Sequence, residues 1–94
     1  MAKITKNSRV VVADDVVSCD LDDEAAILSL KDGVYYGLDP IGAKIWTSIQ
    51  KTCLVNDLIE MILEEYDVDR KICENDILEL INELIDNGLV KVNE

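Results

Sequence analysis

The chain has 94 residues, with nine basic and twenty acidic side chains and a net charge of −11. That length makes one domain with a small core, and an apolar share of 49% argues for a folded protein. The acidic balance disfavours nucleic acid and anionic membranes as partners; it either favours a neutral or basic partner or only keeps the protein dissolved.

The first third of the chain is predicted to form strands. Residues 1–8 are expected to be a loose start, and residues 10–13 could form a short strand although they lack periodicity. Apolar and polar residues alternate over 17–21, which indicates a strand with one face in water. Ala26, Leu28 and Leu30 then alternate with Ile27 and Ser29, which indicates a second strand. The two aspartates between these segments are typical of a turn.

A third strand follows a glycine-containing turn. Gly33 in Lys31-Asp32-Gly33 can adopt positive φ, as a hairpin requires. The strand should run from Val34 to about Leu38, which completes a three-stranded antiparallel meander. Its two faces are predicted by alternation, with Val34, Tyr36 and Leu38 on one and Tyr35 and Gly37 on the other.

Three helices are predicted after the meander, over about 40–50, 55–66 and 70–87. Asp39 is a good N-cap, and Pro40 suits the first helical position. The apolar arc of the third helix spans about 160°, more than one packing partner needs; this helix either contacts two partners or is deeply buried. Gly88 is a natural helix end, followed by an extended tail over 89–92 that is free to return to the sheet.

The order of elements predicts one α+β domain over residues 1–94, with a three-stranded antiparallel sheet followed by three helices. The sheet must bury one face, and the helices are its only cover. The chain start lacks the apolar segment of a secretory peptide, and no apolar run is long enough to span a membrane. We therefore expect a cytoplasmic protein.

The sequence lacks the residue patterns that are common in enzyme active sites. Histidine is absent, so the common general base and the Ser-His and Cys-His pairs cannot occur. Cys19, Cys53 and Cys73 are too scattered for a zinc site or a disulfide framework. The acidic residues at 14–15 and 20–24 resemble a calcium loop only in charge, and a solvated loop is favoured. We expect no enzyme activity, no cofactor and no metal.

The third strand is the candidate binding element. As an outer strand of a meander it has unpaired backbone groups that can accept an added peptide strand. A groove forms if the last helix lies beside it, with Leu80 on the groove wall between Asp76 and Glu83. Leu80 is equally well explained as ordinary core, and Tyr35 as either a surface aromatic or a contact residue.

The chain resembles the PqqD-like family of leader-peptide-binding domains, also called RiPP recognition elements, over about residues 15–92. The likeness is to the free-standing leader-binding half of split lasso-peptide B proteins in particular. The matching features, in order, are Gly33-Val34-Tyr35-Tyr36-Gly37-Leu38-Asp39, Gly42, Ile45-Trp46, Leu58-Ile59, Tyr66-Asp67-Val68, Asp76-Ile77, Leu80-Ile81, Leu84 and Gly88-Leu89.

The resemblance implies a winged-helix-like fold that binds the leader of a ribosomally made precursor peptide. The leader would lie as an added strand on the third strand, against the third helix. A separate modifying enzyme would be the second partner, either a leader protease or the radical enzyme of pyrroloquinoline quinone synthesis. The implied peptide-binding residues are Val34, Tyr35, Tyr36, Gly37, Leu38, Asp39, Asp76, Leu80 and Glu83.

Two positions depart from the family pattern, and two other classes of function compete with it. Asp39 stands where the family often has Asn, and Leu54 where many members have Thr, which puts the cap of the second helix in doubt. A winged-helix DNA-binding protein would need a basic third helix, but this one is acidic. A small enzyme subunit would need a partner or cofactor that the sequence does not reveal.

Overall fold

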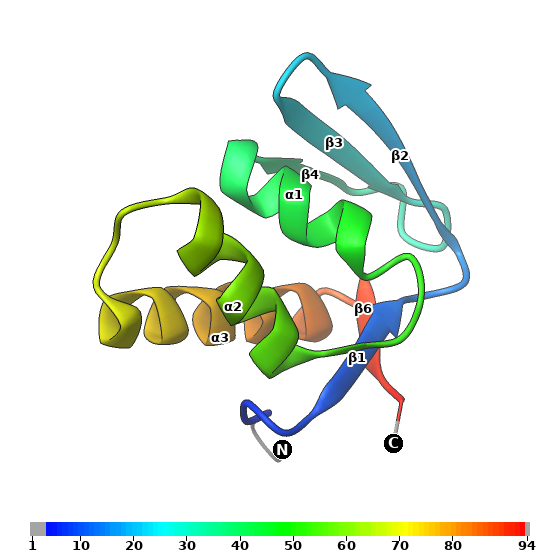
Figure 1. Ribbon diagram of the computed structural model, residues 1–94. Coiled ribbons are helices and arrows are strands. Elements are labelled where there is room, and N and C mark those ends of the chain that lie inside the picture. Colours follow the sequence, from blue (N-terminus) through cyan, green and yellow to red (C-terminus); the bar gives the residue numbers. More distant parts are fainter. Residues whose placement is uncertain (1–3, 94) are drawn as a thin grey trace.

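The computed structural model describes residues 4–93 and shows two small antiparallel sheets with three helices (Figure 1). The α+β class is therefore confirmed. The elements in chain order are β1 (Arg9–Val12), β2 (Val16–Leu21), β3 (Glu24–Ser29), β4 (Tyr35–Leu38), α1 (Pro40–Ser48), β5 (Cys53–Leu54), α2 (Val55–Glu65), α3 (Arg70–Asp86) and β6 (Val90–Val92).

The predicted meander is present as a sheet with strand order β2-β3-β4. The hairpin before β4 uses Gly33 at φ +70°, and its N–H donates to the Ser29 carbonyl at 2.7 Å. The Ser29 N–H in turn donates to the Val34 carbonyl at 3.0 Å. β4 therefore begins at Tyr35, one residue later than predicted, and Val34 is exposed at the end of the turn.

A second sheet, with order β5-β1-β6, was not predicted as such. The tail after α3 returns to β1 rather than to the meander, and Val10 lies between Cys53 on one side and Val92 on the other. These strands are two to four residues long. They are too short to show a period of two, and their pairing joins residues that are far apart in the sequence.

The segment before β1 is packed, so the expectation of a loose start is wrong for residues 4–8; residues 1–3 lie outside the described part. Ile4 is 8% exposed and Ser8 9%. The carbonyls of Lys6 and Ser8 accept hydrogen bonds from the backbone N–H groups of Asn56 and Val55, both at 2.9 Å. They cap α2, whose N-cap residue Leu54 has no side-chain hydrogen bond.

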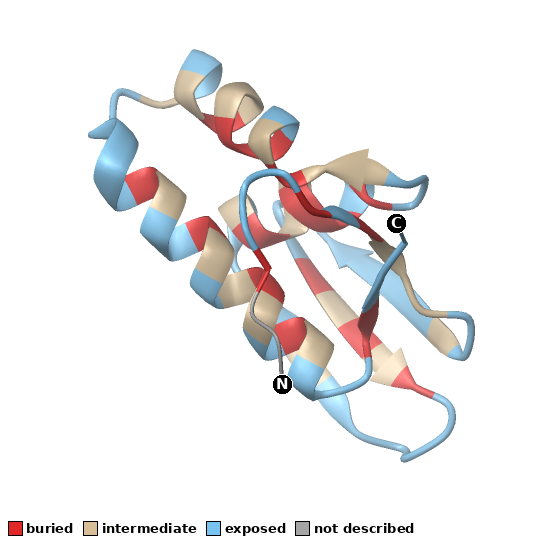
Figure 2. Ribbon diagram, turned by 90° about the horizontal axis from the view of Figure 1, so that it is seen from below, coloured by how far each residue is buried: buried red, intermediate tan, exposed pale blue. Residues whose placement is uncertain are grey.

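The core lies between the meander and the helices, and α1 sits in its middle (Figures 1 and 2). Ile27 of β3 and Ile45 of α1 are fully buried. One stripe of α3 is buried, consisting of Cys73, Ile77, Ile81 and Leu84. Because this helix contacts both α2 and β6, the wide apolar arc reflects more than one packing partner.

No helix within residues 4–93 combines the length and the apolar character needed to cross a bilayer.

Candidate functional site

A hollow of about 510 Å³ lies between β4, the first turns of α1 and the middle of α3. Apolar side chains from all three elements line it, namely Leu38, Ile41, Ile45, Ile77 and Leu80. Four carboxylates also line it, from Asp39, Asp76, Glu79 and Glu83. We call this hollow the β4–α3 groove.

The backbone of β4 is open along the side that borders the groove. Within the described residues β4 pairs only with β3, so it is an edge of the meander. Ser29 and Val34 form a hydrogen-bonded pair, and such pairs alternate with non-hydrogen-bonded pairs in an antiparallel ladder. Tyr35 and Gly37 therefore fall in non-hydrogen-bonded pairs, and their N–H and C=O groups point away from β3. They form the free edge of the strand.

The start of α1 closes one end of the groove because of local capping. Asp39 accepts a hydrogen bond from the Gly42 N–H at 2.8 Å, and Pro40 occupies the first helical position. A Cβ atom on Gly42 would lie 3.2 Å from both the Asp39 carboxylate and the Leu38 side chain. Glycine at this position therefore lets the helix begin directly against the end of β4.

Seven of the nine residues predicted as peptide-binding line this one groove. They are Tyr36, Gly37, Leu38, Asp39, Asp76, Leu80 and Glu83. Tyr35 is 73% exposed and does not line the groove, because successive side chains of a strand point to opposite faces. Val34 lines a neighbouring hollow instead. Leu80 is half-buried, packs against the core and also lines the groove. The interpretation of Leu80 as a core residue and its interpretation as part of the groove wall each describe part of its surroundings.

α1 also contributes to the groove, which was not predicted from the sequence. Ile41, Gly42 and Ile45 line the groove, although the spacing of the two isoleucines had suggested core alone. The sequence did contain a signal for this contribution, because a helix that starts immediately after β4 must flank the end of that strand. Ile77 and Glu79 were also missed, and both are neighbours of predicted residues on α3.

A second hollow of similar size adjoins the groove at Tyr36, which lines both. The hairpin before β4 and the end of α3 form its walls, through residues such as Asp32 and Asp86. Burial is the main cause that raises the pKa of Tyr36 to about 12, and the neighbouring Glu83 side chain adds to it. Tyr36 therefore stays neutral at physiological pH, with Glu83 close by.

The sequence and the fold are similar to those of known proteins. Residues 24–90 match the family described as coenzyme PQQ synthesis protein D (PqqD). The fold is similar to a structure described as TbiB1 in complex with the TbiA(beta) leader peptide, with 33% identity, a TM-score of 0.81 and coverage of 86% of this chain and 94% of the other. No curated protein sequence matched the chain.

A second structure, described as lasso peptide synthetase B1 complexed with the leader peptide, shares the fold at 23% identity and a TM-score of 0.72. It covers 87% of this chain and 96% of the other. The family match spans well over half of the sequence, and the 33% identical structure covers most of both chains. The chain therefore belongs to the PqqD family.

Proposed function

We propose that the protein is a non-catalytic adaptor that binds the leader of a ribosomally synthesised precursor peptide. The leader adds as a strand to β4 and places alternate side chains in the β4–α3 groove. The observation that carries this proposal is the free edge of β4 at Tyr35 and Gly37, directly beside an apolar groove. The similar TbiB1 structure, which is a complex with a leader peptide, supports it.

Strand addition explains how one site can combine affinity with selectivity. The outward N–H and C=O groups of Tyr35 and Gly37 bind any extended backbone, whatever its sequence. Selectivity then comes from the side chains that enter the groove, where Leu38, Ile45 and Leu80 offer an apolar surface. An apolar leader residue buried there stabilises the complex by about 1.5–3 kcal/mol.

The adaptor then presents the bound precursor to a modifying enzyme, which we propose is the leader protease of lasso-peptide biosynthesis. Both similar structures carry B1 names, and one is called a lasso peptide synthetase. The alternative is a radical enzyme, as in pyrroloquinoline quinone synthesis. Mixing the leader-bound protein with each candidate enzyme and measuring complex formation by size-exclusion chromatography distinguishes them.

Isothermal titration with the leader peptides encoded near its own gene tests the adaptor function. We expect one leader to bind at one-to-one stoichiometry, and a scrambled peptide of the same composition to give no heat of binding. A protein that is folded by circular dichroism but binds none of these leaders would contradict the proposal.

A further inference from the structure

The charges of α3 are placed against the preference of the helix itself. Its first turn begins with Arg70 and Lys71, and the one carboxylate at its start is that of the N-cap residue Asp69; its last turn contains no basic residue but includes Glu83 and Asp86. The helix dipole favours the opposite arrangement, with acids at the start and bases at the end. These charges therefore cost the isolated helix some stability. Where local preference is violated in this way, a functional reason is expected.

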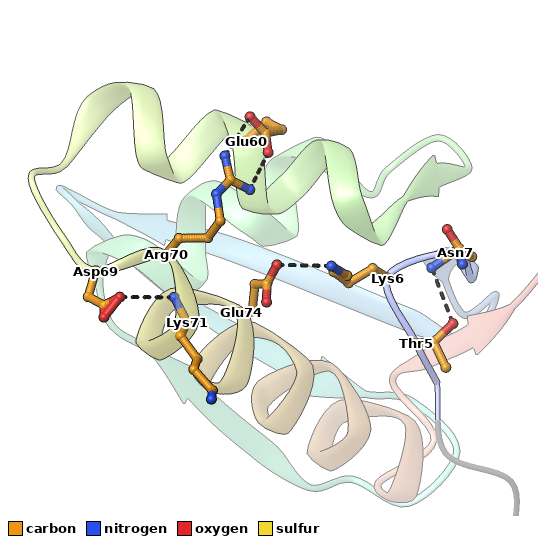
Figure 3. A network of polar contacts seen from close by, with 8 residues as sticks. All are labelled: Thr5, Lys6, Asn7, Glu60, Asp69, Arg70, Lys71 and Glu74. Carbon is orange, nitrogen blue, oxygen red and sulfur yellow. Dashed lines mark hydrogen bonds and ion pairs between the residues drawn. The ribbon is translucent and has the colours of Figure 1, made fainter.

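The basic side chains near α3 lie outside the lining of the groove, and among residues 4–93 most of them form ion pairs elsewhere, with Lys71 the exception on α3. Arg70 donates two hydrogen bonds to the Glu60 carboxylate, at 2.6 and 3.3 Å, and Lys6 pairs with Glu74 at 3.2 Å (Figure 3). The other two ion pairs of the described residues, Lys44 with Glu65 and Lys91 with Asp14, also lie outside the groove. Among residues 4–93, the lining of the groove contains no basic side chain.

Three carboxylates on α3 follow the groove as one row, which we call the acidic rim. Asp76, Glu79 and Glu83 are spaced at i, i+3 and i+7, so they share a face of the helix and repel one another. All three side chains are exposed, and within residues 4–93 none of them has an ion-pair partner. A cation placed between them would remove this repulsion.

We propose that the leader carries a lysine or arginine that binds the acidic rim of α3. The proposal rests on the adaptor function and specifies the chemistry of its ligand. The cation must lie on the face of the added strand that points to α3, which is also the face that carries the apolar anchor. Because successive side chains of a strand alternate between its faces, the sequence positions of the two residues in the leader must differ by an even number.

The same charges also affect how fast the leader binds. Acidic groups without counter-charges attract a basic segment before contact, so the association rate should fall as salt concentration rises. Once the peptide covers the groove, the carboxylates are partly removed from water. Their charge-assisted hydrogen bonds to the leader then become stronger than they would be on an open surface.

The test uses the cognate leader in which each lysine is replaced in turn by norleucine and each arginine by citrulline. We expect one replacement to weaken binding about tenfold, as for the loss of one charge-assisted hydrogen bond. That replacement should cost much less against the Glu79→Gln or Glu83→Gln protein, which is the signature of a direct interaction. Glu64→Gln is the matched control, because Glu64 is exposed on α2 and does not line the groove.

Equal affinity of all neutralised leaders for the wild-type protein would overturn the proposal, as would a coupling to Glu64 as large as that to the acidic rim. Failure of the unmodified leader to bind at all would instead contradict the adaptor function itself. Thermal melting of each variant separates binding from folding, and Glu79→Gln should not lower the melting temperature because Glu79 is exposed and makes no side-chain hydrogen bond in the described part of the chain.

Discussion

Tyr36 on β4 and Glu83 on α3 lie beside each other, so the edge strand and the third helix meet at the junction of two hollows. The phenol is partly withdrawn from water, and the carboxylate next to it disfavours a second negative charge. Tyr36 therefore lies where the β4–α3 groove and the second hollow adjoin, next to Glu83 of α3.

The raised pKa of Tyr36 predicts a specific alkaline transition. The folded state holds this proton up to about pH 12, whereas an unfolded tyrosine loses it near its ordinary pKa of 10. The resulting contribution to stability is complete below pH 10 and disappears as the pH rises through the folded pKa. Absorbance at 295 nm should show one tyrosine titrating late, and Tyr36→Phe should remove that step. A late step that survives in Tyr36→Phe would assign it to Tyr35 or Tyr66.

Gly37→Pro should weaken leader binding about 10- to 100-fold, because proline removes the outward N–H and its ring obstructs the added strand. Titration calorimetry measures the effect. Gly37→Ala is the first control, since an added Cβ meets nothing within 4 Å and the N–H is kept. Ser18→Pro is the second control, because the register of β2 against β3 places the N–H of Ser18 on the opposite edge of the meander. Unchanged affinity of a folded Gly37→Pro protein would exclude strand addition at β4.

Leu80→Asp should weaken leader binding at least tenfold while lowering the free energy of unfolding by only about 1–2 kcal/mol, because Leu80 is half-buried. Ile72→Asp is the matched control on the same helix, since Ile72 is 59% exposed and lies outside the groove. Calorimetry and urea denaturation measure the two effects separately. A Leu80→Asp protein that fails to fold would show that Leu80 belongs to the core rather than to the binding surface.

Ile4→Asp should lower the free energy of unfolding by about 2 kcal/mol, because it releases a buried side chain that holds the segment capping α2. The amide protons of Val55 and Asn56 should then exchange faster with solvent. Lys6→Ala is the control: it removes only a half-exposed ion pair with Glu74, of small value. If both variants lose stability equally, the ion pair rather than the packing of Ile4 holds the segment in place.

The sequence was most informative where the interactions are local. The turn at Gly33, the alternation along β4 and the cap at Asp39 each lie within a few residues, and the structure has all three. The alternation over 17–21 and 26–30 predicted two strands, but the expectation of one face in water is wrong for β2, which buries neither face, and β3 buries Ala25 and Ile27 instead of residues 26, 28 and 30. The second sheet and the backbone cap of α2 depend on contacts between distant segments, and no local pattern carries that information.

The groove was only partly predictable for a related reason. Ile41 and Ile45 have the spacing of a core stripe, and only the fold shows that they also line the groove, Ile41 partly buried and Ile45 fully buried. The sequence favoured neither interpretation of Leu80, as a core residue or as part of the groove wall, for the same reason: one apolar side chain can contact both. Site residues that also pack the core look like core residues in the sequence.

The hairpin before β4 has a consequence for how this site can change. The positive φ of Gly33 and the Ser29–Val34 pair set the register of β4 against β3. Loss or gain of one residue in this loop would exchange the two faces of the strand and turn Tyr36 and Leu38 outward. New leader specificities must therefore arise by substitution along the groove, because the length of the turn cannot vary by a single residue without dismantling the site.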